Sequence, residues 1–150
     1  MKKIAVFPGS FDPFTNGHKN IVDRCIPLFD EIVVAIGVNT TKSYLFPVEQ
    51  RVEAIRKTFA NSENVRVETF RGLTADYCRS IGAKWIVRGL RNSIDFEYEQ
   101  SIASMNKALN PEIETIFLFT DPALQPISST IVREIHRSGG DISQFVPTIP

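Results

Sequence analysis

The sequence predicts a single α/β domain built on a doubly wound, five-stranded parallel sheet with helices on both faces. Short apolar segments rich in β-branched residues alternate with longer segments in which apolar residues recur every three or four positions. Such an alternation calls for parallel strands joined by right-handed crossovers. The 150 residues have the length of one domain, and no repeat or linker divides them, so one domain over 1–150 is expected.

Each predicted strand is a short apolar run bounded by polar, Gly or Pro residues. The first, at 4–7, is apolar at every position and stops at Pro8-Gly9, as expected of a strand that is buried on both faces. Four further runs follow the same pattern. They cover 32–38, 65–70, 85–88 and 113–119.

The predicted helices are marked by a change of period. Apolar residues at 48, 52, 55 and 59 share one helical face, as do those at 98, 102, 105 and 109. Helices are therefore expected at 48–59 and at 98–109, where Asn110-Pro111 ends the second, and also near 17–29, 73–80 and 128–138. Gly139-Gly140 closes the last of these. Because Tyr98, Met105 and Leu109 share one stripe, we expect them in the core.

Charge and cysteine usage exclude several classes of function. Seventeen basic and seventeen acidic residues cancel, so no global field exists to hold nucleic acid or an anionic membrane. Cys25 and Cys78 have no second Cys or His at metal-binding spacing, which predicts buried thiols in a reducing cytoplasm rather than zinc or a disulfide. The apolar run at 4–7 is too short for a signal peptide, and nothing approaches the roughly 20 apolar residues of a membrane span.

Cations gather at the predicted carboxyl ends of the strands. In an open parallel sheet the ligand binds outside these ends, near the point where strand order reverses, as in Rossmann-like folds. The strand exits carry His18, Lys42, Arg71, Arg88 and Arg91. A neutral protein that concentrates cations on one edge is expected to bind an anionic substrate.

The first strand exit, residues 9–18, has glycines that let backbone N–H groups approach phosphate. It does not fit G-x-G-x-x-G, and no G-x-x-x-x-G-K-[ST] occurs, so hydride-transfer cofactors and P-loop hydrolysis lose support. His18 would open the next helix, whose dipole favours a neutral imidazole that can still donate to a phosphoryl oxygen. The alternative is a histidine that only begins the helix and faces solvent.

The other cations also have alternatives. Lys42 could be an exposed loop lysine. Arg88 ends the apolar run Trp85-Ile86-Val87, so its guanidinium must find an anion or reach water. For Arg88 and Arg91, the alternative to a substrate contact is a structural ion pair with Asp95 or Glu97.

Four motifs together resemble a known family. The run from Phe7 to Asp12-Pro13, continued by Thr15-Asn16-Gly17-His18, looks like the nucleotidyltransferase superfamily with its [HT]-x-G-H motif. More narrowly, Arg88-Gly89-Leu90-Arg91, the run from Asp95 to Glu99 and Ile127-Ser128-Ser129-Thr130 resemble the bacterial phosphopantetheine adenylyltransferases of coenzyme A synthesis. The resemblance covers nearly the whole chain.

The resemblance implies transfer of AMP from ATP to 4'-phosphopantetheine, which gives dephospho-coenzyme A and pyrophosphate. Mg²⁺ would accompany ATP, and no metal-ligating residue is implied. By the same resemblance the protein would form a homohexamer, with coenzyme A as a candidate feedback ligand. Such a reaction needs no protein nucleophile, so catalysis rests on positioning two polyanions and stabilising charge.

The resemblance also assigns residues. His18, Lys42 and Arg91 would stabilise the phosphoryl charge in the transition state. The acceptor, 4'-phosphopantetheine, would be bound by Ser10, Lys42, Thr74 and Arg88. The nucleotide would be bound by Ser10, Phe11, His18, Gly89, Leu90, Arg91, Glu99, Leu124, Gln125, Pro126, Ile127, Ser128, Ser129 and Thr130.

Two alternatives remain open for the function. A relative in the same superfamily could adenylylate nicotinate mononucleotide or transfer CMP to an alcohol phosphate, although the runs 88–91 and 95–99 argue against both. A protein of another class could bind ATP as a sensor without turnover. Retention of His18, Lys42 and Arg91 together argues against the sensor.

Overall fold

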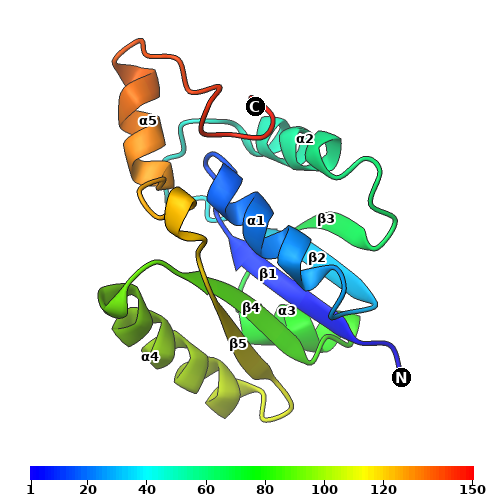
Figure 1. Cartoon of the computed structure of the whole chain (residues 1–150). Helices are drawn as coiled ribbons and strands as arrows, with labels where there is room; N and C mark the ends of the chain where they lie inside the picture. The colour runs from blue at the N-terminus through cyan, green and yellow to red at the C-terminus, as the bar shows by residue number, and fades with distance from the viewer.

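A computed structural model describes all 150 residues, and five strands alternate with five α-helices along the chain (Figure 1). The strands are β1 (Ile4–Gly9), β2 (Glu31–Gly37), β3 (Val65–Phe70), β4 (Trp85–Leu90) and β5 (Glu114–Phe119). The helices are α1 (Asn16–Cys25), α2 (Val48–Thr58), α3 (Thr74–Ile81), α4 (Ser93–Leu109), the short 3₁₀-helix η1 (Pro122–Leu124) and α5 (Ser129–Arg137). The predicted fold class is confirmed.

The sheet is parallel throughout, and its strand order is β3-β2-β1-β4-β5. The chain winds outward from β1 through β2 to β3, then returns to the other side of β1 for β4 and β5. The pairing of β1 with β2 continues to Gly9, whereas the register of β1 with β4 runs only over Ala5–Trp85 and Val6–Ile86. Beyond these pairs β1 and β4 diverge, which opens a crevice at the topological switch point.

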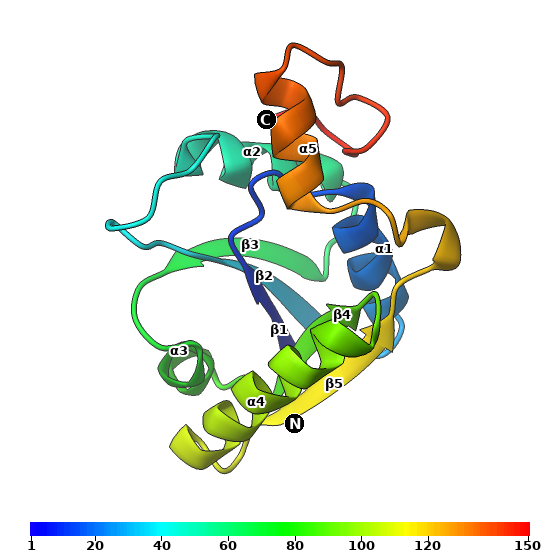
Figure 2. The ribbon, with the colours of Figure 1, turned by 90° about the vertical axis from the view of Figure 1, so that its left-hand side faces the viewer.

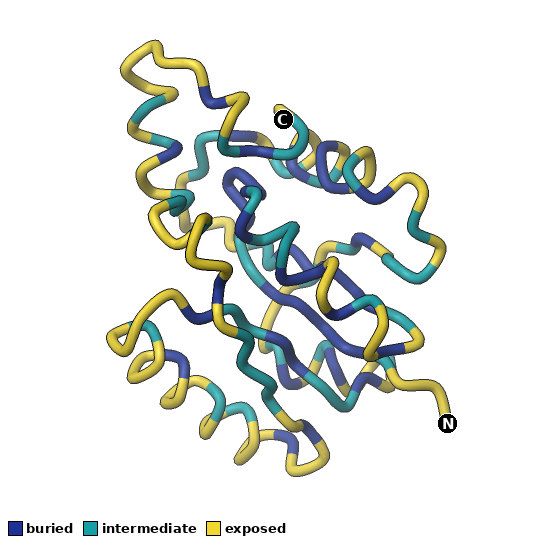
Figure 3. The backbone as a smooth tube through the Cα atoms, in the orientation of Figure 1, coloured by how far each residue is buried: buried dark blue, intermediate teal, exposed yellow.

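Both faces of the sheet are covered. Because successive residues of a strand point to opposite faces, Phe7 of β1 packs in the core with α1 and α2, and Val6 packs on the other face with Ala75 and Cys78 of α3. Figure 2 shows α1, α2 and α5 on one side of the sheet and α3 and α4 on the other. The burial of β1 and β2 on both sides, visible in Figure 3, explains their unbroken apolar sequences.

Helix boundaries differ from the predicted ones where local chemistry outweighs the apolar period. The helix expected to reach residue 29 ends at Cys25, since Pro27 has no N–H to continue it. The helix expected from residue 98 begins at Ser93, because the Asn92 side chain accepts a hydrogen bond from Asp95 N–H (2.9 Å) and caps it. As predicted, α5 is followed by Gly139 in the left-handed region, with φ of +82°.

The prediction that the apolar stripe of α4 lies in the core is wrong. Tyr98, Met105 and Leu109 are 69%, 62% and 45% exposed, and Ile102 is 37% exposed. The less exposed face of α4 instead carries Asp95, Glu99, Ala103 and Asn106, and most of the helix is coloured as exposed in Figure 3. A helical period identifies an apolar face but does not say what covers it. In the single chain nothing covers this one.

A third, smaller core joins the C-terminal part of the chain to the loop before α2. Phe46 from that loop packs with Val132 of α5 and with Ile142 and Val146 from the segment after α5. The same segment reaches α1, where the Phe145 carbonyl accepts a hydrogen bond from Asn16 N–H (2.9 Å). None of the helices combines the length and the apolar character that crossing a bilayer demands.

Candidate active site

A capping box fixes the ring of His18 in the first turn of α1. The Thr15 hydroxyl accepts a hydrogen bond from His18 N–H (3.3 Å), and His18 Nδ1 accepts one from Thr15 N–H (2.9 Å). Because Nδ1 acts as an acceptor, the proton of the neutral imidazole must be on Nε2. The sequence therefore supplies one oriented N–H donor at the start of α1.

The surroundings of His18 keep its ring neutral. The rings of Phe7, Phe11 and Phe14 lie with centroids 6.1, 5.0 and 5.3 Å from the imidazole centroid. Burial, followed by the positive charges of Arg88 and Arg91, lowers the pKa of His18 to about 3. The imidazole is half-buried rather than solvent-facing, and at physiological pH it can donate a hydrogen bond but carries no charge.

Three adjoining hollows follow the crevice between the carboxyl ends of β1 and β4. We name each after one lining residue: the Ser128 hollow (about 260 Å³), the Lys42 hollow (about 240 Å³) and the Thr74 hollow (about 230 Å³). Arg88 lines all three, and His18 lines the first two. His18, Lys42, Arg88 and Arg91, which come from separate crossovers, therefore meet along one crevice, whereas Arg71 is exposed and lines none of the hollows.

The Ser128 hollow joins the start of α5 to the end of β4. Its lining includes His18, Gly89, Arg91 and the segment 127–130. The Ser128 hydroxyl caps α5 by accepting from Ile131 N–H (3.2 Å), and the Ser129 hydroxyl donates to the Pro13 carbonyl (2.8 Å). The Ser129 hydrogen is thus engaged, whereas the Ser128 and Thr130 hydroxyls act only as acceptors within the protein and keep their hydrogens for a phosphate, beside a guanidinium and a neutral imidazole.

The Lys42 hollow lies between the Ser128 hollow and the Thr74 hollow. Lys42 Nζ lies 3.5 Å from Ser10 Oγ, and both side chains line the hollow with His18 and Arg133. Lys42 and Arg133 take part in none of the ion pairs of the chain. Two uncompensated positive charges thus face this part of the crevice.

The Thr74 hollow extends from the crevice toward the face of the sheet that α3 and α4 cover. Ser10 and Arg88 line its inner part, and Thr74, Ile102 and Asn106 line its outer part. The mixture of an amide, a hydroxyl and apolar side chains suits a ligand that is polar at intervals along an apolar chain.

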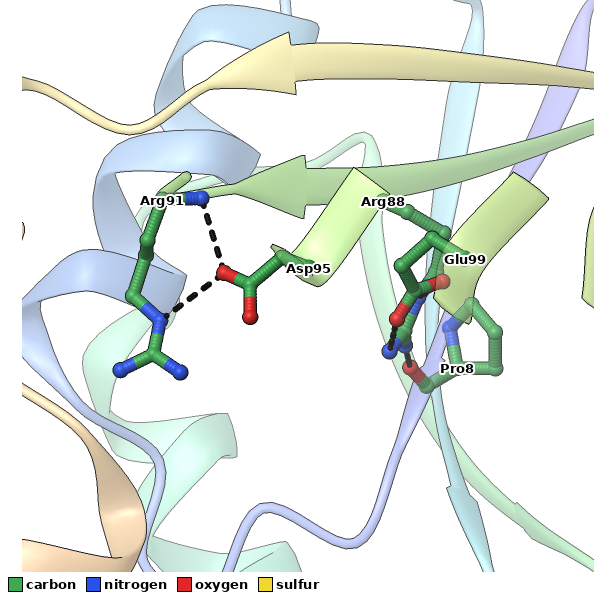
Figure 4. A network of polar contacts seen from close by, with 5 residues as sticks. All are labelled: Pro8, Arg88, Arg91, Asp95 and Glu99. Carbon is green, nitrogen blue, oxygen red and sulfur yellow. Dashed lines mark hydrogen bonds and ion pairs between the residues drawn. The ribbon is translucent and has the colours of Figure 1, made fainter. Parts of the chain in front are cut away.

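Two carboxylates hold Arg88 of β4 and Arg91, the residue that follows β4, as Figure 4 shows. Arg88 donates from Nε to Glu99 Oε2 (2.9 Å) and from Nη2 to Glu99 Oε1 (2.6 Å), and its Nη1 donates to the Pro8 carbonyl. Arg91 Nε lies 3.2 Å from Asp95 Oδ2. The expected ion pairing is present, but Arg88 pairs with Glu99 rather than with Asp95 or Glu97.

The Glu99 side chain is 9% exposed and both of its carboxylate oxygens are taken by Arg88. A bidentate pair of this kind fixes the plane of the guanidinium. Of the five N–H groups of Arg88, two have no protein partner and remain for a ligand. Glu99 therefore orients Arg88, and its assigned contact with the nucleotide stays a prediction, since each carboxylate oxygen keeps a lone pair that can accept from a ligand.

Comparison with known proteins agrees with the geometry. The sequence model of the cytidylyltransferase-like family matches residues 6–135. The phosphopantetheine adenylyltransferase of Cytophaga hutchinsonii is 49% identical over 147 residues, 98% of this chain and 98% of that protein. That of Flavobacterium psychrophilum is 53% identical over 143 residues, 95% of this chain and 94% of that protein. The chain belongs to the phosphopantetheine adenylyltransferase family.

Solved structures support the fold of this family member. A bifunctional NMN adenylyltransferase/ADP ribose pyrophosphatase from Francisella tularensis is similar with a TM-score of 0.75 at 20% identity, over 99% of this chain and 46% of that longer one. A putative nicotinate-nucleotide adenylyltransferase from Vibrio parahaemolyticus has a TM-score of 0.66 at 21% identity, over 97% and 94% of the two chains. At such identities the likeness concerns the fold alone.

Some residues assigned from the family resemblance lie away from the three hollows. Leu90 is buried, and Leu124, Gln125 and Pro126 in or beside η1 line none of the hollows. The other assigned residues line at least one. They are Ser10, Phe11, His18, Lys42, Thr74, Arg88, Gly89, Arg91, Glu99, Ile127, Ser128, Ser129 and Thr130.

Sequence reasoning missed several polar residues of the site. Arg133 lines the Lys42 hollow and donates to the Asp12 carbonyl (2.9 Å) and to Thr130 Oγ1 (3.2 Å). The sequence could have indicated Arg133, because it follows the assigned residue Ser129 by four positions and so shares a helical face with it. Asn106 had a similar signal, because it follows the assigned residue Glu99 by seven positions and so shares its helical face. Asp12 and Arg51, each 3% exposed, gave none, since nothing in a sequence marks a charged residue as buried.

Carboxylates near the crevice are already engaged by the protein. Asp95 and Glu99 pair with arginines, and both oxygens of Asp12 accept backbone N–H groups, from Leu45 (2.8 Å) and Phe46 (2.9 Å). The chain brings together no group of three His, Cys, Asp or Glu side chains. A cation at this site would therefore have to take its ligands largely from a bound anion and from water.

Proposed function

We propose that this chain transfers AMP from ATP to 4'-phosphopantetheine and releases dephospho-coenzyme A and pyrophosphate. The observation that carries the proposal is the convergence of His18, Lys42, Arg88 and Arg91 on one crevice at the switch point of the sheet. Identity of about half over nearly the full length of relatives bearing this activity in their names supports the choice of acceptor.

The reaction is an in-line displacement at phosphorus. An oxygen of the acceptor phosphate forms a bond to the α-phosphorus, and the bond from the α-phosphorus to the bridging oxygen breaks, so that pyrophosphate carries away the electron pair. Negative charge therefore builds on the α-phosphoryl oxygens and on the leaving group. No covalent protein intermediate is needed, and the site supplies fixed donors and cations instead.

Each of these side chains interacts with a separate part of that charge. His18 Nε2–H donates to an α-phosphoryl oxygen; being uncharged, it binds the ground-state triphosphate weakly and gains strength as charge develops. Lys42, flexible and without an ion-pair partner, lies between acceptor and nucleotide and follows the moving charge. Arg91 and the Ser128 and Thr130 hydroxyls hold the outgoing phosphates in the Ser128 hollow.

The acceptor enters from the Thr74 hollow. Arg88, held by Glu99, uses its two remaining N–H groups for the acceptor phosphate. The pantetheine arm, which alternates amides with short apolar links, then lies along Thr74, Ile102 and Asn106. Coenzyme A carries the same arm and an adenylate, so it would compete for this crevice as a feedback ligand.

Mg²⁺ belongs to the substrate in this proposal. The carboxylates of the site are engaged, so the ion would arrive bound to the triphosphate and keep water among its ligands. It would neutralise part of the pyrophosphate charge, while the protein orients the phosphates. A location in the cytoplasm remains part of the proposal, supported by the two buried free cysteines.

Assembly into a homohexamer is also proposed. The exposed stripe of α4, with Tyr98 and Met105 more than half exposed, continues an apolar surface that a single chain leaves uncovered. Contact with further copies would bury it, as monomeric proteins rarely expose large contiguous apolar patches. The homohexameric state itself comes from the family resemblance.

Pyrophosphate release tests the function. The chain is mixed with MgATP and either 4'-phosphopantetheine or nicotinate mononucleotide, and in a parallel reaction with MgCTP and glycerol phosphate. Release only with 4'-phosphopantetheine is expected, together with dephospho-coenzyme A in the products. Release with another acceptor would identify a different nucleotidyltransferase. If ATP binds and no acceptor releases pyrophosphate, the protein is a sensor. The His18→Ala variant serves as the matched control for contaminating activity.

A further inference from the structure

Two loops bring Ser10 and Lys42 together, and the sheet holds the second of them only at its first residue, where Val38 N–H donates to the Phe70 carbonyl of β3 (2.8 Å). Residues 10–15 connect β1 to α1, and residues 38–47 connect β2 to α2. Lys42 Nζ and Ser10 Oγ lie 3.5 Å apart across the Lys42 hollow. Since the loop residues that carry Ser10 and Lys42 lie outside the strand pairing, other groups must satisfy their backbone and set the position of the loops.

Arg51, in the first turns of α2, supplies two of these contacts. It is 3% exposed, and its Nη1 donates to the Ser10 carbonyl (2.7 Å) while its Nε donates to the Phe46 carbonyl (2.9 Å). The Tyr44 ring covers the guanidinium, with 4.2 Å between the ring centroid and Cζ. One buried side chain thus ties the loop of Ser10 to the loop of Lys42.

Asp12 provides the reciprocal contacts. It is also 3% exposed, and its carboxylate accepts from Leu45 N–H (2.8 Å) and Phe46 N–H (2.9 Å). The Phe46 residue is therefore held by its amide through Asp12 and by its carbonyl through Arg51. Its ring packs on Val132 of α5, the helix that begins with Ser129. We call Asp12, Phe46 and Arg51 together the node. The node connects both loops that line the Lys42 hollow to each other and to α5.

The chemistry of this node favours positioning over simple packing. Burying a guanidinium costs free energy unless its N–H groups form hydrogen bonds. The Nε and Nη1 groups of Arg51 form them with backbone carbonyls of the loops that carry Lys42 and Ser10. Arg51 lines none of the three hollows, so it acts on the site through other residues. A lysine could not replace it, because an ammonium lacks the planar fork that reaches two carbonyls at once.

We propose that Arg51 is a positioning residue for adenylyl transfer, which sets the separation of Ser10 and Lys42 by joining the Ser10 and Phe46 carbonyls. The kinetic part of this inference rests on the proposed function. The structural part, that Arg51 holds the 39–47 loop in place, does not depend on it.

The test combines kinetics with hydrogen exchange on the full chain. Arg51→Lys should lower kcat about tenfold, because a small misplacement of a reacting group is costly. In a Lys42→Ala background the same change should cost less than about twofold, because the group being positioned is gone. Amides of 39–46 should exchange at least about fivefold faster, while those of β2 stay unchanged. Arg56→Lys, on the exposed side of α2, is the matched control and should alter none of these.

The outcomes separate the two proposals. A tenfold loss in both backgrounds, or faster exchange throughout the chain, would mean that Arg51 is merely structural. Unchanged kcat and unchanged exchange in Arg51→Lys would overturn the inference as well. If Arg51→Lys does not fold, Asp12→Asn applies the same test from the other side of Phe46. If the wild-type chain shows no transfer, the proposed function fails, and the exchange of 39–46 alone decides whether Arg51 holds the loop.

Discussion

The depressed pKa of His18 makes stability depend on pH in a way that can be measured. An imidazole in the unfolded chain has a pKa near 6.5, whereas burial and the charges of Arg88 and Arg91 lower that of His18 to about 3 in the fold. The folded state therefore binds fewer protons than the unfolded state between these values. The stability that His18 contributes is complete above pH 6.5 and is lost progressively as the pH falls toward 3.

The size of the effect follows from the unfolded chain. At pH 5 the unfolded imidazole is almost fully protonated and the folded one is neutral, so linkage removes about 2 kcal/mol between pH 8 and pH 5. The figure hardly changes for any folded pKa below about 4, because at pH 5 only the unfolded state then takes up the proton. It therefore does not depend on the depth of the shift.

Urea unfolding at pH 8 and pH 5 measures this loss of stability, and the His18→Gln variant is the comparison. Glutamine at this position keeps the capping box with Thr15, so the variant loses the titrating ring and retains the local helix start. The free energy of unfolding of the wild type should fall by about 2 kcal/mol more than that of the variant over this pH step. His136→Gln, at an exposed site, is the control. A difference below about 0.5 kcal/mol would show that the ring titrates normally and refute the neutral donor.

Three further predictions concern the site and the surface. His18→Ala should lower kcat roughly 10²-fold with the Kd for ATP changed only a few-fold, and equal losses in both would contradict a transition-state role. Glu99→Gln should raise the KM for 4'-phosphopantetheine about tenfold by loosening Arg88, with ATP affinity retained; loss of ATP affinity instead would make Glu99 a nucleotide contact. Met105→Lys should shift sedimentation toward smaller species while Gln100→Lys, outside the apolar stripe, leaves it unchanged, and an unshifted Met105→Lys would remove this stripe from the interface.

The sequence predicts the fold well because the signals are local. Unbroken apolar runs at 4–7 and 32–38 follow from burial of the strand on both faces, and a strand of this kind needs no distant partner to be recognised. The ends of the helices were harder to predict, because they depend on single side chains. The Asn92 side chain, for example, caps α4 so that the helix begins five residues before its apolar stripe. The apolar stripe of α4 led to a wrong prediction, because an exposed apolar face has the same period as one that packs on its own core.

The site was predictable only in part, for a related reason. His18 and Arg91 stand in motifs and Lys42 follows a predicted strand, and the carboxyl ends of parallel strands gather such residues at one edge. The partner of a charge cannot be read in this way. Arg88 is paired with Glu99, 11 positions away, whereas Asp95 and Glu97 are nearer in sequence; only the rotation of α4 decides which carboxylate faces β4. Arg51 and Asp12 contact backbone atoms more than 30 residues distant, and no pattern encodes that.

These pairings explain how a site for polyanions can exist in a protein of zero net charge. Arg88 and Arg91 are each held by their own carboxylate, so their orientation is set before any ligand arrives, and part of their N–H capacity is left over. His18 adds a donor without a charge, and only Lys42 and Arg133 remain uncompensated. A site of this kind recognises phosphates by the direction of fixed donors more than by bulk attraction. The affinity of the site for ATP should therefore fall only weakly as ionic strength rises, although ATP is a polyanion. Isothermal titration calorimetry at increasing salt concentration measures this dependence. A steep fall would mean that the carboxylates do not hold the arginines when the ligand binds.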